Sequence, residues 1–213
     1  MFHVPGGNDL KDTQKKRLTG AAVIVMSAIT VSRITGFLRS TLISNMLKSK
    51  TETDAFIMAF SITDLMYNLL VGGAISAALI PVLTGFIARK EEEEGWKAVS
   101  TFINIIIIAM VAISSLGIIF SPQIVDVIAK GFADEKKQLT VRLVRILFPS
   151  VSFIMLAGIT NGVLNSYQRF AAAAYGPSLY NMGSALSVLL LSRYGVEKVA
   201  LGFMCSALFY FLF

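Results

Sequence analysis

Two arginines inside a long apolar stretch are the residues of this chain best suited to chemistry. Arg33 and Arg39 lie in an apolar run from residue 18 to residue 47, in a chain that is 55% hydrophobic. A charge at the centre of a membrane helix costs about 2.5 to 3.5 kcal/mol and usually faces a polar cavity, a partner or an anionic ligand. Guanidinium groups bind phosphate through two parallel hydrogen bonds. The pair therefore predicts a site for a phosphate-bearing ligand, with a structural ion pair to Asp54 or Asp64 as the alternative.

A polar stripe in the next apolar segment is the second candidate. Its members recur at spacings of 3, 4, 4 and 4 residues, which places them on one helix face. They are Ser61, Asp64, Asn68, Gly72 and Ser76. Small and amide side chains on such a face allow membrane helices to pack closely. An aspartate also needs a cation or water, so Asp64 and Asn68 are candidates for lining a cavity.

Two more arginines lie one helical turn apart further along the chain, at Arg142 and Arg145. Arg142 is expected to extend its guanidinium to the membrane surface at the start of a helix. Pro149 cannot donate a backbone hydrogen bond, so it leaves the carbonyl of Arg145 free. Arg145 is therefore kept as a candidate substrate-binding residue.

Apolar segments of the length needed to cross about 30 Å of hydrocarbon organise the chain. They cover approximately residues 18–43, 55–86, 98–121, 139–163, 172–192 and 199–213. We predict an all-α fold, a polytopic bundle of about six transmembrane helices over 18–213 after a tail at 1–17. Cations just before the first segment favour a cytoplasmic N-terminus in a multi-pass protein of the cell membrane. The last segment ends without a polar anchor, so we expect a longer, transporter-like protein.

Several function classes are disfavoured by composition. The chain has a single cysteine, Cys205, and a single histidine, His3, so no metal-binding cluster is expected. It also lacks a glycine-rich phosphate loop and a nucleophile elbow, so we predict no cofactor and no enzyme activity. The net charge of +6 is spread along loops between apolar segments, which favours anionic lipid head groups over nucleic acid as the partner.

Ordered blocks of this sequence resemble the MurJ/MviN-type lipid II flippases of the multidrug/oligosaccharidyl-lipid/polysaccharide exporter superfamily. The first blocks are SRITGFLR at 32–39, TDAFIMAF at 53–60, GA at 73–74 and IPVL at 80–83. Later blocks are GFA at 131–133, RILFP at 145–149, GVLN at 162–165, RF at 169–170 and GP at 176–177. The resemblance covers roughly residues 18–195.

The resemblance implies a protein of about fourteen membrane helices in two related lobes, with this chain as the N-terminal lobe. Such a protein moves an undecaprenyl-diphosphate-linked peptidoglycan precursor outward by alternating access. Arg33 and Arg39 match the family's cavity arginines on the first helix, and Asp54 matches its aspartate before the second helix. The implied partners are the polyprenyl-diphosphate-linked glycan lipid, membrane lipids and cell-wall synthesis proteins.

Three sites depart from the family's pattern and leave other functions open. Ser40 stands where the family has an acid after the second arginine. Tyr67 and Asn68 replace the family's paired arginines in the second helix, and Gly72 replaces a glutamate. One alternative is a related flippase for another polyprenyl-linked glycan, and another is a drug/cation antiporter of the same superfamily. A further alternative is a non-transporting membrane scaffold for cell-wall enzymes.

Overall fold

The computed structural model describes the backbone of residues 7–213, and their side chains except at 7–18, 21, 69–79 and 172. The described chain is helical and contains no strand, which confirms the predicted all-α class. Its elements are α1 (Gly7–Met46), α2 (Lys50–Ala88), α3 (Glu92–Ile119), α4 (Ser121–Ile128), α5 (Asp134–Ser166), α6 (Phe170–Leu191), the short 3-10 helix η1 (Ser192–Tyr194) and α7 (Val196–Leu212).

Within the described residues, three helices are long and apolar enough to cross a membrane. They are Ala22–Met46 within α1, α3 and α5. That α2, α6 and α7 also cross the membrane stays a prediction. Prolines lie inside α2, α5 and α6, and membrane helices tolerate them because neighbouring groups satisfy the freed carbonyls.

Two helices, α3 and α5, begin earlier than the apolar segments do, because the polar residues that precede each apolar segment form the first turn of the helix. α3 begins at Glu92, ahead of the expected start near residue 98, and its first turn is acidic. α5 begins at Asp134, ahead of residue 139, again with acidic residues in its first turn. Negative charge there is stabilised by the helix dipole. The short helix α4 was not expected from the sequence.

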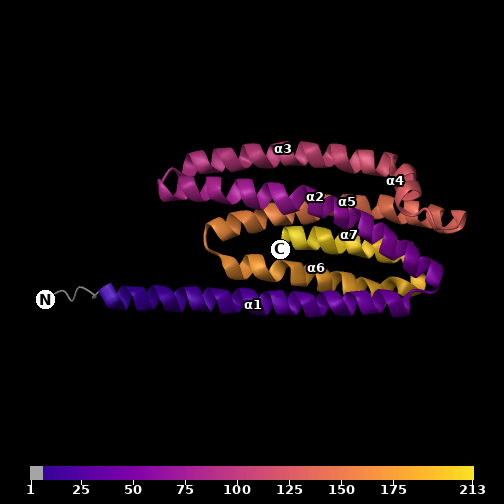
Figure 1. Cartoon of the computed structure of the whole chain (residues 1–213), viewed down its shortest axis with the longest axis horizontal. Helices are drawn as coiled ribbons and strands as arrows, with labels where there is room; N and C mark the ends of the chain where they lie inside the picture. Colours follow the sequence, from indigo (N-terminus) through magenta and orange to yellow (C-terminus); the bar gives the residue numbers. More distant parts are fainter. Residues whose placement is uncertain (1–6) are drawn as a thin grey trace.

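The long helices lie side by side in two groups joined by α7 (Figure 1). α1 packs on α6, while α2 packs on α5 and α3 covers both of them. α7 contacts α5 and α6, and the chain ends in the middle of the bundle. Figure 1 places α1 at one edge and α3 at the opposite edge.

Phe203 of α7 lies at the centre of the core where α2, α5 and α7 meet. Its fully buried ring is edge-on to Phe56 and Phe60 of α2, with centroids 5.0 and 5.9 Å away. Tyr180 of α6 makes a similar contact at 6.5 Å. Such pairs contribute about 0.5 to 1.5 kcal/mol beyond area burial. Phe60 and Tyr180 also line the cavity described next, so the core fixes its walls.

Candidate functional site

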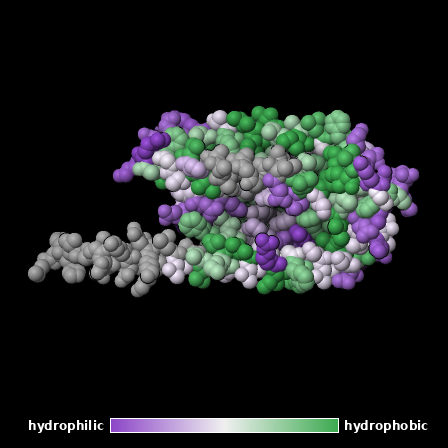
Figure 2. Space-filling model, in the orientation of Figure 1, coloured by the Kyte–Doolittle hydropathy of each residue, from purple (hydrophilic) through white to green (hydrophobic). Residues whose placement is uncertain are grey.

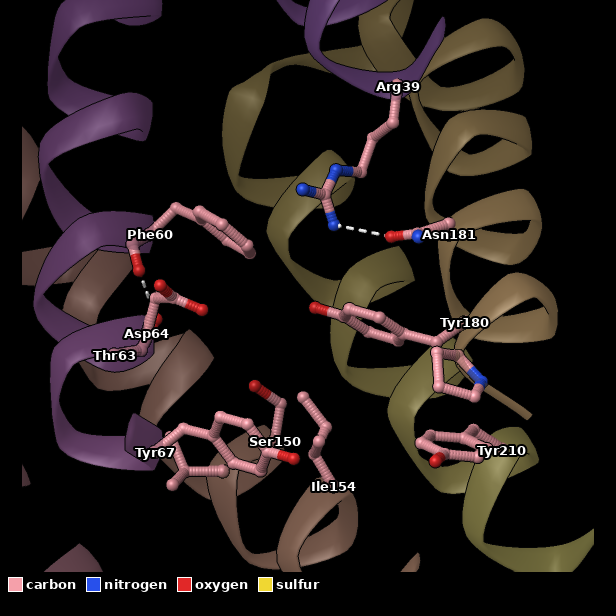
Figure 3. Close-up of a pocket in the computed structure, with 12 residues that line it drawn as sticks. Arg39, Phe60, Thr63, Asp64, Tyr67, Ser150, Ile154, Tyr180, Asn181 and Tyr210 are labelled. Atoms are coloured by element: carbon pink, nitrogen blue, oxygen red, sulfur yellow. Dashed lines mark hydrogen bonds between the residues drawn. The ribbon is translucent and has the colours of Figure 1, made fainter. Parts of the chain in front are cut away.

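A cavity of about 240 Å³ lies inside the bundle between the α1–α6 pair and the α2–α5 pair (Figure 3). Its polar side chains come from five different helices. They are Arg39 of α1, Thr63, Asp64 and Tyr67 of α2, Ser150 of α5, Tyr180 and Asn181 of α6, and Tyr210 of α7. The space-filling view shows hydrophilic atoms along the hollow between these helix pairs, with hydrophobic atoms above and below (Figure 2).

Arg39 is held in this cavity by neutral groups. Its Nη1 donates to Oδ1 of Asn181 at 2.9 Å, and its guanidinium lies 4.8 Å from the ring centroid of Phe60. The Nδ2 of Asn181 donates in turn to the carbonyl oxygen of Ser32 at 3.0 Å, so the amide links α1 to α6. The Nε of Arg39 is buried and has no partner among the described residues. The guanidinium is therefore positioned, but its charge is not paired within that part of the chain.

Asp64 lies across the cavity from Arg39, on α2 (Figure 3). The Nδ2 of Asn68 donates to the Asp64 carboxylate at 3.1 Å and to its carbonyl at 2.9 Å. Among the ion pairs of the described part of the chain, none includes Asp64, Arg33 or Arg39. The cavity thus separates an anionic wall from a cationic wall, with the Tyr180 hydroxyl between them (Figure 3).

A wider groove of about 510 Å³ opens beside the cavity, between α1 and α6. Arg33 and Arg39 both line it, together with Ser32, Ser40 and Asn181. Its described lining contains two cations and no acid, so the groove favours an anion. The structure therefore brings the two predicted arginines together in one opening.

Asp54 and Arg145, in contrast, lie away from the cavity and the groove. Asp54 forms an ion pair with Lys136 of α5, so the structure does not support its pairing with either arginine of α1. The Nε of Arg145 donates to Oγ of Ser121 at 3.0 Å and lies 3.4 Å from the carbonyl oxygen of Ile118. These contacts connect α5 to α4 and to the end of α3.

The residues of the polar stripe on α2 have different surroundings in the structure. Asp64 lines the cavity, and Asn68 reaches it only through its bonds to Asp64. Ser61 is exposed and bonds to the Ile57 carbonyl of its own helix. Gly72 and Ser76 belong to the side chains that the structure does not describe.

Sequence reasoning missed the contribution of α6 and α7 to the site. Asn181 is an amide inside the apolar segment 172–192, and this was the available signal. It lies against Gly36 of α1, where a Cβ atom would be 3.4 Å from its Nδ2. The hydroxyl of Tyr210 accepts from Nδ2 of Asn161 at 2.7 Å, which fixes another wall. No local pattern indicates that this tyrosine lines a cavity.

Known proteins similar to this chain are longer. The "Lipid II flippase MurJ" of Burkholderia cenocepacia is 33% identical over 164 residues, which is 76% of this chain and 32% of that protein. The "Probable lipid II flippase MurJ" of Buchnera aphidicola subsp. Baizongia pistaciae is 31% identical over 181 residues, 84% of this chain and 35% of that protein. The chain thus spans about a third of the length of these relatives.

Two solved structures share the fold. "Lipid II flippase MurJ, inward closed conformation" matches with a TM-score of 0.75 and 27% identity over 89% of this chain and 40% of that one. A transporter of the MOP superfamily from Pyrococcus furiosus matches with a TM-score of 0.75 over 93% of this chain and 43% of that one, at 15% identity, which shows the fold alone. The family model described as "Lipid II flippase MurJ" matches residues 43–213, and this multi-pass membrane chain belongs to that family.

Proposed function

We propose that this chain forms one lobe of a flippase that carries lipid II, an undecaprenyl-diphosphate-linked peptidoglycan precursor, outward across the cell membrane by alternating access. Family membership supports this proposal. The observation that carries it is the groove in which Arg33 and Arg39 lie together without an acidic residue in its described lining. A diphosphate is the part of such a lipid that needs two cations when it leaves water.

Arg33 and Arg39 would bind the phosphate oxygens while the polyprenyl chain stays in the hydrocarbon. Arg39 is suited to this because Asn181 and Phe60 fix its guanidinium before a ligand arrives. Pre-positioned charge lowers the entropy lost on binding. With the N-terminus in the cytoplasm, an inside-negative potential favours outward movement of each negative charge by about 2.3 kcal/mol per 100 mV. The voltage itself would then assist export.

Asp64 and Asn68 are proposed to face the neutral part of the head group. Asp64 lies opposite Arg39 and has no ion pair within the described residues. Its carboxylate can accept hydrogen bonds from glycan hydroxyls or peptide amides. No covalent step is required, and cell-wall synthesis proteins are the expected protein partners.

Lipid binding by the purified chain in nanodiscs tests this function. We expect undecaprenyl diphosphate to bind more tightly than undecaprenyl phosphate, and undecaprenol to bind least. Arg33→Gln and Arg39→Gln should each weaken binding of the diphosphate by about 10- to 150-fold, the loss of a charged hydrogen bond worth roughly 1.5 to 3 kcal/mol.

Arg169→Gln is the matched control, because Arg169 is exposed between α5 and α6 and lines neither the cavity nor the groove. It should bind the diphosphate like the unaltered chain. Equal binding of undecaprenol and the diphosphate would overturn the proposal. So would Arg33→Gln and Arg39→Gln variants that behave like the control.

A further inference from the structure

The short helix α4 has three faces with different surroundings. One is buried on the bundle and consists of Ser121 and Val125, followed by Ala129 just after the helix. A second is polar and exposed, with Gln123, Asp126 and the following Lys130. The third is apolar and exposed, with Phe120 just before the helix, Val127 and Ile128. At 100° per residue these sets occupy separate sectors of the helix.

Two polar contacts fix the rotation of α4 on α5. The Nε of Arg145 donates to Oγ of Ser121 at 3.0 Å. The Nζ of Lys137 forms an ion pair with Asp126 at 2.8 Å. Both contacts approach from α5. In the apolar sector, Ile124 packs partly against the bundle core, whereas Val127 remains 67% exposed.

The apolar sector of α4 follows directly after α3 in the chain. α3 is a candidate membrane span at the edge of the bundle, and it packs on α2, α4 and α5 (Figure 1). Its outward side chains, which include Ile108, Leu116 and Ile119, are exposed and apolar. These side chains contact the lipid hydrocarbon if α3 spans the membrane. α4 begins directly after this surface, at the point where the chain must leave the hydrocarbon.

The polar surface of the molecule agrees with this position. Figure 2 shows hydrophilic atoms gathered at the end of the bundle where Figure 1 places α4, next to a hydrophobic band along the helices. A helix with a polar face and an apolar face at such a boundary lies in the interface, with the apolar face inserted about 5–10 Å below the head groups.

We propose that α4 is an interfacial helix whose apolar sector, Phe120, Val127 and Ile128, inserts into the lipid surface while Gln123, Asp126 and Lys130 face water. The partner is the head-group and upper acyl region of the bilayer. Arg145 is then a positioning residue that holds α4 on α5. This inference does not depend on the flippase activity.

Depth-dependent fluorescence quenching tests the proposal on the whole chain in phosphatidylcholine vesicles. Trp96 is the single tryptophan, so Trp96→Phe gives a background in which one new tryptophan reports its surroundings. Phe120→Trp and Val127→Trp probe the apolar sector. Gln123→Trp is the matched control on the polar face, and Ile108→Trp is a reference on the outer face of α3.

Lipids brominated at carbons 6 and 7 should quench Phe120→Trp and Val127→Trp at least about twice as strongly as Gln123→Trp. Lipids brominated at carbons 11 and 12 should quench Ile108→Trp most. Equal quenching of the two sectors would overturn the proposal, and so would a blue-shifted tryptophan that neither lipid quenches, because protein would then cover the sector. Phe120→Trp replaces one aromatic ring by another and gives the same reading if Val127→Trp does not fold.

Discussion

An alanine at Gly117 gives the sharpest test of the packing between α3 and α5. A Cβ atom there would lie 2.2 Å from Cε1 and 2.4 Å from Cζ of Phe148. Carbon atoms pack at about 3.5–4.0 Å, so the ring would have to move by roughly 1.3 Å. Phe148 is buried in the core cluster shared by α2, α5 and α7, which leaves the ring little room.

The size of the effect follows from two opposing contributions. Overpacking costs about 1–3 kcal/mol, and a contact this short lies at the upper end of that range. Replacing glycine by alanine within a helix stabilises the folded chain by about 0.5–1 kcal/mol. We therefore expect Gly117→Ala to lower the free energy of unfolding by about 2 kcal/mol, and the midpoint of thermal unfolding by about 4 to 8 °C. Circular dichroism of the detergent-solubilised chain measures both.

Gly85→Ala is the matched control, since Gly85 also lies in the last turn of its helix, α2, and a Cβ atom there would meet no neighbouring group within 4 Å. It should leave stability unchanged or raise it slightly. The Phe148→Leu change should relieve the contact, so the double variant with Gly117→Ala should be more stable than the sum of the single effects by about 1 kcal/mol or more. Strictly additive effects, or a Gly117→Ala chain as stable as the control, would refute the packing.

Two further predictions concern contacts at the helix ends. Lys136→Met and Asp54→Asn should each lower the free energy of unfolding by about 1 kcal/mol, because the ion pair that joins α5 to α2 is only partly shielded from water. Urea unfolding should show that the double variant is no less stable than either single variant. Two independent losses of stability would contradict the ion pair. Gly195→Ala should destabilise the chain by about 1–3 kcal/mol, because the backbone φ of +108° at this position suits glycine alone. The control Gly131→Ala, at a position without positive φ, should leave stability unchanged. Equal unfolding midpoints for these two variants would contradict this explanation.

The helical character of the chain was predictable because it is a local property. Apolar segments in hydrocarbon must satisfy their own backbone hydrogen bonds, and helices do this within one segment. The placement of Arg33 and Arg39 on neighbouring faces of one helix also follows from spacing alone. We did not predict α4, because its eight residues are too few to cross a membrane. The division of α4 into buried, polar and apolar faces becomes apparent only when its packing against α5 is known.

The sequence by itself therefore determined an all-α membrane chain with two arginines in its first apolar segment, because composition and periodicity act over a few turns. Only the tertiary structure decided which side chains meet. Arg39 bonds Asn181, 142 residues away, while Arg145 turns to Ser121 and Asp54 to Lys136. These pairings depend on how whole helices pack and rotate against one another, which no single segment encodes.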